Sequence, residues 1–162
     1  MIILGTTIPI TPFSKQSTTF AKGKAYTNSK KKKDAERFIL EFYSNVSKKD
    51  INLIRSFINT TNDKDLYIEA NVIYNYKFDT TLTKKRINDL ISLFGYVPKN
   101  TTPDIMDNLN KSIFDCLSKI LNFNDGRICK FNAVKRYDNK DSIEINLKFY
   151  NIKNDKNDYR NN

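Results

Sequence analysis

Histidine and tryptophan are both absent from this chain of 162 residues. Without histidine the chain cannot form a Ser-His-Asp or Cys-His catalytic arrangement, a histidine general acid or base, or a zinc site that contains histidine. The two cysteines, Cys116 and Cys129, are too few for a disulfide framework and are not in CxxC spacing. We interpret them as ordinary thiols in a reducing compartment. If the protein is an enzyme, carboxylates or lysines carry out its chemistry.

Long apolar segments are missing, and glycine and proline are scarce, with four residues each. No apolar run approaches the ~20 residues that cross a bilayer. The initial MIILGTTIPI has neither a basic flank nor a small-residue cleavage site, so we identify no signal peptide. The hydrophobic share of 39% and the charged share of 28% are typical of a globular domain. We therefore expect one domain, residues 1–151, followed by a disordered tail, residues 152–162, in a cytoplasmic protein.

The formal net charge is +10, and most of it lies near the N-terminus. Residues 1–33 carry seven lysines and no acidic residue, whereas the rest of the chain carries 21 basic and 18 acidic residues. This distribution favours a polyanionic partner, of which nucleic acid is the simplest. The alternatives are a solvated basic arm and a membrane surface, although the basic segment lacks the large apolar residues of an interfacial helix.

Hydrophobic patterns predict an α+β fold in which a small mixed β-sheet packs against at least two helices. Strands are expected at residues 2–10, 65–78, 128–134 and 143–149, and the polar YDNKDS should join the last two as an antiparallel hairpin. Residues 14–33 are expected to form a loose, basic hairpin. The alternation in residues 65–78 is the clearest, because Leu66, Ile68 and every second residue after them are apolar.

Helical spacing is found in three further segments. The first begins near Ser29, and its apolar face comprises Ala35, Phe38, Ile39, Phe42, Tyr43 and Val46. Residues 51–60 either extend this helix or form a second one. Residues 87–94 fit a short helix followed by a loop. The strongest helix covers residues 103–121, and its apolar stripe comprises Leu109, Ile113, Cys116, Leu117 and Ile120.

Three carboxylates around this last helix could carry chemistry. Asp104 and Asp107 lie at its start, where either could simply cap the helix, and Asp125 lies in the turn after it. Asp107, Lys111 and Asp115 recur every four residues and therefore share a face. Oxygen ligands without histidine or cysteine suit Mg²⁺. Bringing both ends together requires the helix to bend back, or a site shared between chains.

The run DNLNKSIFDCLSK from Asp107 to Lys119, followed by NDGRI and then Lys135, resembles the signature of RusA-type Holliday-junction resolvases. That pattern reads approximately P-D-x-D-N-L-x-K, then an apolar position and D-x-L, then D-D-x-Q-I and a distal Lys. Pro9, Pro12 and Lys15, and then GKAYT, are similar to the family's P-x-x-K-x-R opening and its basic G-x-x-Y segment. The resemblance spans residues 7 to 149.

The resemblance implies a small endodeoxyribonuclease that uses Mg²⁺, or Mn²⁺ in its place, and acts as a homodimer on four-way junctions by paired phosphodiester hydrolysis. Such a protein is nucleoid-associated or encoded by a phage or mobile element. The resemblance assigns metal binding and catalysis to Asp104, Asp107 and Asp125, and catalysis at the phosphate to Lys111. Asn108 and Asp115 match supporting positions. The expected DNA contacts are Lys15, Lys22, Lys24, Lys30, Lys31, Lys32, Lys33, Lys84, Lys85, Arg86 and Arg127.

This sequence departs from the family pattern at the site itself. Asp104 precedes Asp107 by three residues rather than two, Asn124 stands where the pattern has an acid, and Arg127 stands where it has Gln. Gln16, Ser17 and Thr18 occupy a region that is often rich in arginine. The alternative function is therefore a DNA-binding or RNA-binding protein that keeps the fold without catalysis. RNA is the less favoured ligand, because the chain has no RNP aromatic motif and no KH-type GxxG loop.

Overall fold

The computed structural model describes residues 1–14, 19–21, 24–26, 29–78 and 81–154, with backbone only for 19–21, 24–26, 29–31, 106 and 107. Five strands form one mixed sheet in the order β1-β7-β4-β6-β5. Their bounds are Ile2–Ile8 (β1), Leu66–Lys77 (β4), Val97–Pro98 (β5), Ile128–Asp138 (β6) and Ser142–Asn151 (β7). The helices are α1 (Ser29–Asn45), α2 (Lys48–Thr60), α3 (Lys84–Phe94) and α4 (Asn110–Leu121). The predicted α+β class is confirmed.

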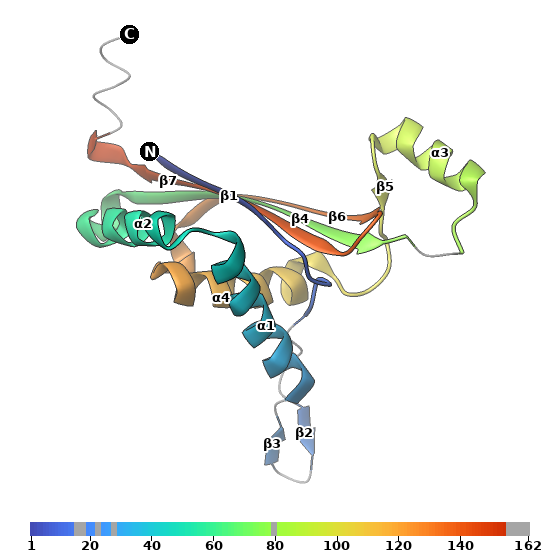
Figure 1. The fold of residues 1–162 in the computed structure, drawn as a ribbon, viewed down its shortest axis with the longest axis horizontal. Coiled ribbons are helices and arrows are strands. Elements are labelled where there is room, and N and C mark those ends of the chain that lie inside the picture. The colour runs from blue at the N-terminus through green and yellow to red at the C-terminus, as the bar shows by residue number, and fades with distance from the viewer. Residues whose placement is uncertain (15–18, 22–23, 27–28, 79–80, 155–162) are drawn as a thin grey trace.

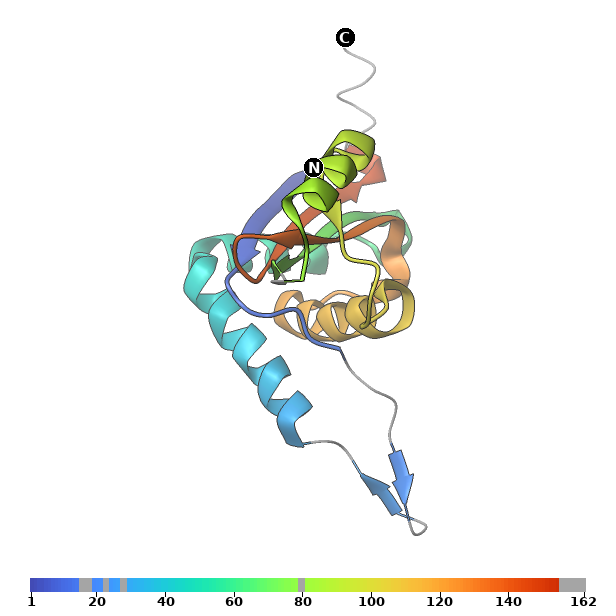
Figure 2. The ribbon, with the colours of Figure 1, turned by 90° about the vertical axis from the view of Figure 1, so that its right-hand side faces the viewer.

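Helices α1, α2 and α4 cover one face of the sheet (Figure 1). A separate two-stranded hairpin, β2 (Thr19–Ala21) and β3 (Lys24–Tyr26), lies at the far end of α1 from the sheet (Figure 2). The hairpin and the helix from Ser29 are therefore confirmed. Residues 51–60 belong to the separate helix α2, since Ser47 caps it by accepting the Asp50 amide hydrogen at 3.0 Å.

The core lies between the sheet and these helices. Strand β4 supplies its centre, since Leu66, Ile68, Ala70, Val72 and Tyr74 are buried while the residues between them face the other side. The predicted stripe of α4 is also fully buried.

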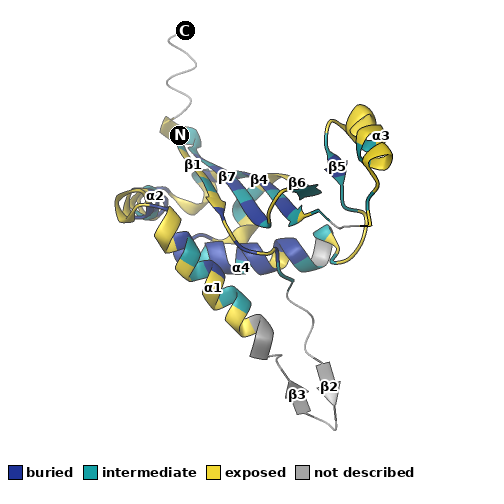
Figure 3. Ribbon diagram, turned by 45° about the vertical axis from the view of Figure 1, so that its right-hand side comes forward, coloured by how far each residue is buried: buried dark blue, intermediate teal, exposed yellow. Residues whose placement is uncertain are grey.

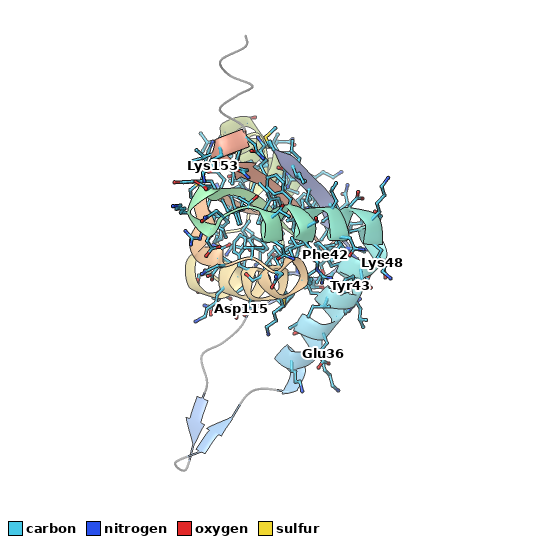
Figure 4. The ribbon with its side chains drawn as sticks, turned by 90° about the vertical axis from the view of Figure 1, so that its left-hand side faces the viewer. Glu36, Phe42, Tyr43, Lys48, Asp115 and Lys153 are labelled. Carbon is cyan, nitrogen blue, oxygen red and sulfur yellow. The ribbon has the colours of Figure 1, made fainter. Side chains whose placement is uncertain are left out.

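The predicted apolar face of α1 is correct in the main but not at one residue. Phe38, Phe42 and Val46 are buried, whereas Tyr43 is 47% exposed. Arg55 donates a hydrogen bond to the Tyr43 hydroxyl at 3.2 Å, and Figure 4 shows Tyr43 beside Phe42 on α1. The hydroxyl keeps its polar contact because the ring lies at the edge of the helix layer.

The prediction that β6 and β7 form a hairpin is wrong. Strand β4 lies between them, parallel to β6 and antiparallel to β7. Neighbouring strands are ~4.8 Å apart, so residues 139–141 span a gap of about 10 Å, which their extended length allows. Asp141 stabilises this crossing, because its carboxylate accepts hydrogen bonds from the Lys77 amide at 2.7 Å and the Thr11 hydroxyl at 2.6 Å.

Helix α3 stands apart from the sheet and is connected to it through β5 (Figure 3). Residues 95–103 were predicted to be loop throughout, but Val97 and Pro98 pair with β6. Gly95 ends α3 in the left-handed conformation at φ 77°. None of the α3 residues is buried, and Ile91, Leu93 and Phe94 are 46%, 73% and 49% exposed. The apolar side of this helix is therefore only partly covered within the described chain, where the Phe94 ring lies 6.3 Å from that of Tyr96.

The end of the chain follows β7. Residues 152–154 form a helical turn at the start of the predicted tail, and Lys153 Nζ lies 3.1 Å from Asp65 Oδ2. Residues 155–162, the rest of that predicted tail, lie outside the described residues.

The role of Asp141 in the crossing leads to a prediction. Replacing Asp141 with Ala removes the acceptor of the Lys77 amide and the Thr11 hydroxyl, which are exposed and can bond water instead. It should lower the free energy of unfolding by about 0.5–1.5 kcal/mol in urea denaturation. Asp141→Asn keeps one oxygen and should lose less. Asp89→Ala, a carboxylate removed from exposed α3, should change stability by less than ~0.5 kcal/mol. Equal losses for the Asp141→Ala and Asp89→Ala variants would contradict the assigned role.

Candidate active site

The start of the α4 segment is a π turn rather than a regular helix. Ile105–Leu109 form this turn, and the Leu109 amide donates to the Asp104 carbonyl at 3.2 Å. The Asp104 carboxylate accepts hydrogen bonds from the Asn108 main-chain amide at 3.3 Å and from the Asn108 side-chain amide. A π turn holds one residue more than an α turn. It therefore takes up the additional residue between Asp104 and Asp107.

A buried hydrogen bond holds the next turn of α4 against the sheet. The Tyr74 hydroxyl on β4 donates to Asn110 Oδ1 at 2.8 Å, and both side chains are buried. Burial, and secondarily Tyr76, raise the pKa of the Tyr74 hydroxyl far above its usual range, so it remains a donor. The Tyr74–Asn110 hydrogen bond was not predicted from the sequence. The available signal was a polar residue directly after Leu109, at the edge of an apolar stripe.

Beyond Asn110, α4 borders a cavity of about 420 Å³ that brings three predicted residues together. Lys111 and Asp115 from α4 and Asp125 from the following turn line it, over a floor that includes Phe114 and Phe131. These two rings pack edge to face, with centroids 5.4 Å apart. Asp125 reaches this cavity from the turn between α4 and β6, whereas Asp104, at the other end of the same segment, does not line it.

Asp104 borders a different cavity, of about 660 Å³, together with Asn108 and residues 10–14 and with Asp34 and Arg37 of α1. The π turn separates the two cavities along the chain. The backbone places Asp107 within that turn, between Asp104 and the Lys111 cavity, and its side chain is among those the structure does not describe.

The turn after α4 is built by Asn124 and Gly126. Asn124 Oδ1 accepts the Gly126 amide hydrogen at 2.9 Å, and a Cβ on Gly126 would lie 3.1 Å from that oxygen. Glycine therefore allows the close approach, and Asn124 uses its oxygen to shape the turn that presents Asp125. Arg127, a predicted DNA contact, forms an ion pair with Asp63 at 2.9 Å.

A lysine on β6 holds the loop that leads to Asp104. Lys135 Nζ donates to the main-chain carbonyls of Pro103, at 2.6 Å, and Thr101. Burial and then Lys99 lower the pKa of Lys135, while Asp104 opposes this shift. From the sequence, Lys135 is only the distal Lys of the family pattern, and its hydrogen bonds to this loop were not predicted.

A protein-family model described as "Endodeoxyribonuclease RusA" matches residues 9–148. The chain belongs to the RusA endodeoxyribonuclease family. A search of curated proteins finds no match to it. Within the part of the chain that the structure describes, every helix is too short or too polar to cross a bilayer.

Because the chain belongs to the RusA family, we asked which of its residues could hold a divalent metal ion. Asp115 and Asp125 supply carboxylate oxygens at one cavity, and Mg²⁺ is commonly held by one or two carboxylates together with substrate phosphates and water. Among the described side chains, to which that of Asp107 does not belong, no three carboxylates or cysteines lie close enough to hold a metal ion. The donor set therefore fits Mg²⁺ in the coordination that leaves positions for water and phosphate.

Apart from Arg127, the predicted DNA contacts belong to the N-terminal region and to the first turn of α3. Lys84, Lys85 and Arg86 are exposed in the first turn of α3. Lys32 and Lys33 are exposed on α1, and Lys32 lies 4.0 Å from Glu36. Lys24, Lys30 and Lys31 are described by backbone alone, and Lys15 and Lys22 lie outside the described residues.

The Tyr74–Asn110 hydrogen bond leads to a stability prediction. Tyr74→Phe leaves the buried Asn110 oxygen unpaired and should lower the free energy of unfolding by about 1–3 kcal/mol. Tyr67→Phe removes a hydroxyl from the outward face of the same strand, where Tyr67 is 39% exposed, and should cost less than ~0.5 kcal/mol. Urea denaturation of both variants checks this. A Tyr74→Phe variant as stable as the Tyr67→Phe variant would show that the bond does not hold α4.

Proposed function

We propose that this RusA-family chain is a Mg²⁺-dependent, structure-selective endonuclease that resolves four-way DNA junctions by paired phosphodiester hydrolysis. The observation that carries the proposal is the cavity where Lys111, Asp115 and Asp125 meet, directly after the π turn that contains Asp107. Family membership supports nuclease activity on DNA. Metal dependence, junction selectivity and the residue roles are our proposal.

Asp107 and Asp125 would hold the metal ion, with Asp104 as a third ligand. The ion would supply an activated water and would neutralise charge that develops on the phosphate. Asp104 borders the other cavity. It is included because the π turn takes up one additional residue between Asp104 and Lys111, so these two keep the relation that a shorter spacing has in a regular helix. Asp115 would support the site through its carboxylate at the cavity wall.

Lys111 would bind the phosphate group that is cleaved. Its side chain is exposed and forms no ion pair with a described carboxylate. The ammonium group is thus available to an anionic substrate, and removing it should weaken stabilisation of the transition state rather than metal binding.

Binding of the junction would depend on charge and shape. The basic N-terminal region and the first turn of α3 would contact phosphates, which position a protein on DNA without reading its sequence. Paired cuts in two strands suit a protein with twofold symmetry, so we propose a homodimer. The exposed apolar side chains of α3 support a protein contact there, because large exposed apolar patches often mark interaction surfaces.

We predict that Asp107→Asn and Asp125→Asn each lower nicking of a fixed four-way junction in Mg²⁺ by roughly a hundredfold or more. Binding measured in Ca²⁺ should be unchanged or tighter, because each change removes a negative charge near the phosphate. Lys111→Ala should lose cleavage to a similar extent with little change in metal affinity. Asp50→Asn at the start of α2, which lies outside every proposed contact, is the matched control and should cleave normally. Full cleavage by Asp107→Asn would overturn the proposed mechanism.

Asp104 has its own prediction. If the π turn keeps it at the metal, Asp104→Asn should reduce cleavage as Asp107→Asn does, and raising the Mg²⁺ concentration should recover part of the activity. Asn caps a helix as well as Asp, so loss of the cap would not explain such a decrease. Unchanged cleavage and unchanged Mg²⁺ dependence would limit Asp104 to capping the turn.

A second function, DNA binding without catalysis, is favoured by one observation. Asn124 replaces an acid of the family pattern, and its oxygen is bonded to the Gly126 amide, so this position adds no negative charge for a metal. The two functions differ in one result: absence of nicked product from the unmodified protein in Mg²⁺ and in Mn²⁺ would favour the binding function.

A further inference from the structure

Strands β4 and β6 extend beyond the start of α4 (Figure 1). A second cluster of charged and aromatic side chains lies on residues near the ends of these strands and just after β5. Lys99 Nζ lies 5.1 Å from the centre of the Tyr76 ring and 5.3 Å from that of Tyr137. Phe78 stacks on Tyr137 with centroids 6.1 Å apart. All four side chains are partly buried. The two tyrosine rings therefore hold the Lys99 ammonium group in place through cation–π attraction.

Lys135 brings a second ammonium group to the same place. Lys99 Nζ donates to the Thr101 hydroxyl, and Lys135 Nζ donates to the Thr101 carbonyl and, at 2.6 Å, to the Pro103 carbonyl. The backbone couples the two lysines as well, since the Lys99 amide donates to the Lys135 carbonyl at 3.0 Å. Both ammonium groups thus meet at Thr101, three residues before Asp104.

The hydrogen bonds leave donors unused. An ammonium group has three N–H donors, of which Lys99 uses one and Lys135 two, so three remain between them. Neither lysine forms an ion pair with a described carboxylate. The nearby Asp104 carboxylate is already hydrogen-bonded to Asn108. Two adjacent positive charges in a partly buried place repel each other, and an anion placed between them relieves that repulsion.

We propose that Lys99 and Lys135 form a phosphate-binding site that receives a backbone phosphate of the DNA strand entering the cavity beside Asp104. Lys135 fixes the loop and contributes one donor, while Lys99, held between its two rings, contributes the others. The proposal rests on the proposed function for the source of the phosphate. It adds a site outside the Lys111 cavity, and neither lysine was among the expected DNA contacts.

The test measures how salt changes the affinity for a four-way junction in Ca²⁺. Each phosphate contact adds about 0.9 to the slope of log affinity against log salt. Lys99→Gln should therefore lower the slope by about 0.9 and weaken binding at 0.1 M salt about tenfold, whereas Lys99→Arg should restore both. Lys49→Gln is the matched control, because it removes the same charge from the start of α2, at the opposite end of the sheet (Figure 1). An unchanged slope for Lys99→Gln would overturn the site.

Inorganic phosphate provides a second readout that needs no DNA. In the unmodified protein it should shift the amide NMR signals of Lys99 and Thr101, and in the folded Lys99→Gln variant it should not. If these shifts occur but the junction does not bind, the phosphate site stands and the proposed function fails. If the unmodified protein cuts the junction while phosphate leaves both signals unmoved and the Lys99→Gln slope is normal, only the phosphate site fails.

Discussion

The packing of α4 against β4 positions the whole candidate site. Every apolar residue of the α4 stripe is buried against the sheet, and the Tyr74–Asn110 hydrogen bond fixes the first turn of the helix. Asn110 is followed directly by Lys111, and the π turn with Asp107 precedes it. A shift of α4 along β4 would therefore move the carboxylates and the lysine together. A buried hydrogen bond resists such a shift because breaking it leaves two polar groups without partners.

The same sheet supports both anionic-ligand sites that we propose. On the α4 side, β6 provides the wall of the Lys111 cavity through Ile128 and Phe131. Farther along β6, Lys135 and Tyr137 face the loop that carries Lys99 and leads to Asp104. The strand thus connects the turn that carries Asp125 with the loop before the π turn. Segments that precede and follow α4 in the chain therefore both contact β6.

Local patterns in the sequence predicted the elements well and the connections between them less well. The period-two alternation of β4 and the apolar stripe of α4 are set by burial on one side, and the structure confirms both. The β6–β7 hairpin failed because a short polar connection does not reveal that β4 lies between the two strands. The hydrogen bond that the Tyr43 hydroxyl accepts comes from Arg55 of another helix, which no local pattern contains.

The candidate site was predicted in its residue types but not in its arrangement. Spacing alone gave Lys111 and Asp115 a common face. The structure places Asp125 at the same cavity and Asp104 at a different one. The π turn was not predictable, since the additional residue at Asp104 could equally have belonged to the preceding loop. Tyr74 lies on the apolar face of the strand predicted at residues 65–78. A hydrophobicity pattern does not indicate that its hydroxyl bonds Asn110. The role of Lys135 depends on carbonyls more than 30 residues away in the chain.

We propose that a divalent metal ion is held between the π turn and the turn after α4. Titrating the unmodified protein with Mn²⁺ and recording backbone amide NMR signals tests it directly, because the paramagnetic ion broadens the signals of nearby residues. We expect the strongest broadening at residues 104–111 and 124–128, with reversal by excess Mg²⁺ and sharp signals throughout α2. Broadening centred on another acidic region, such as Glu69 or Glu144 on the open face of the sheet, would contradict the account.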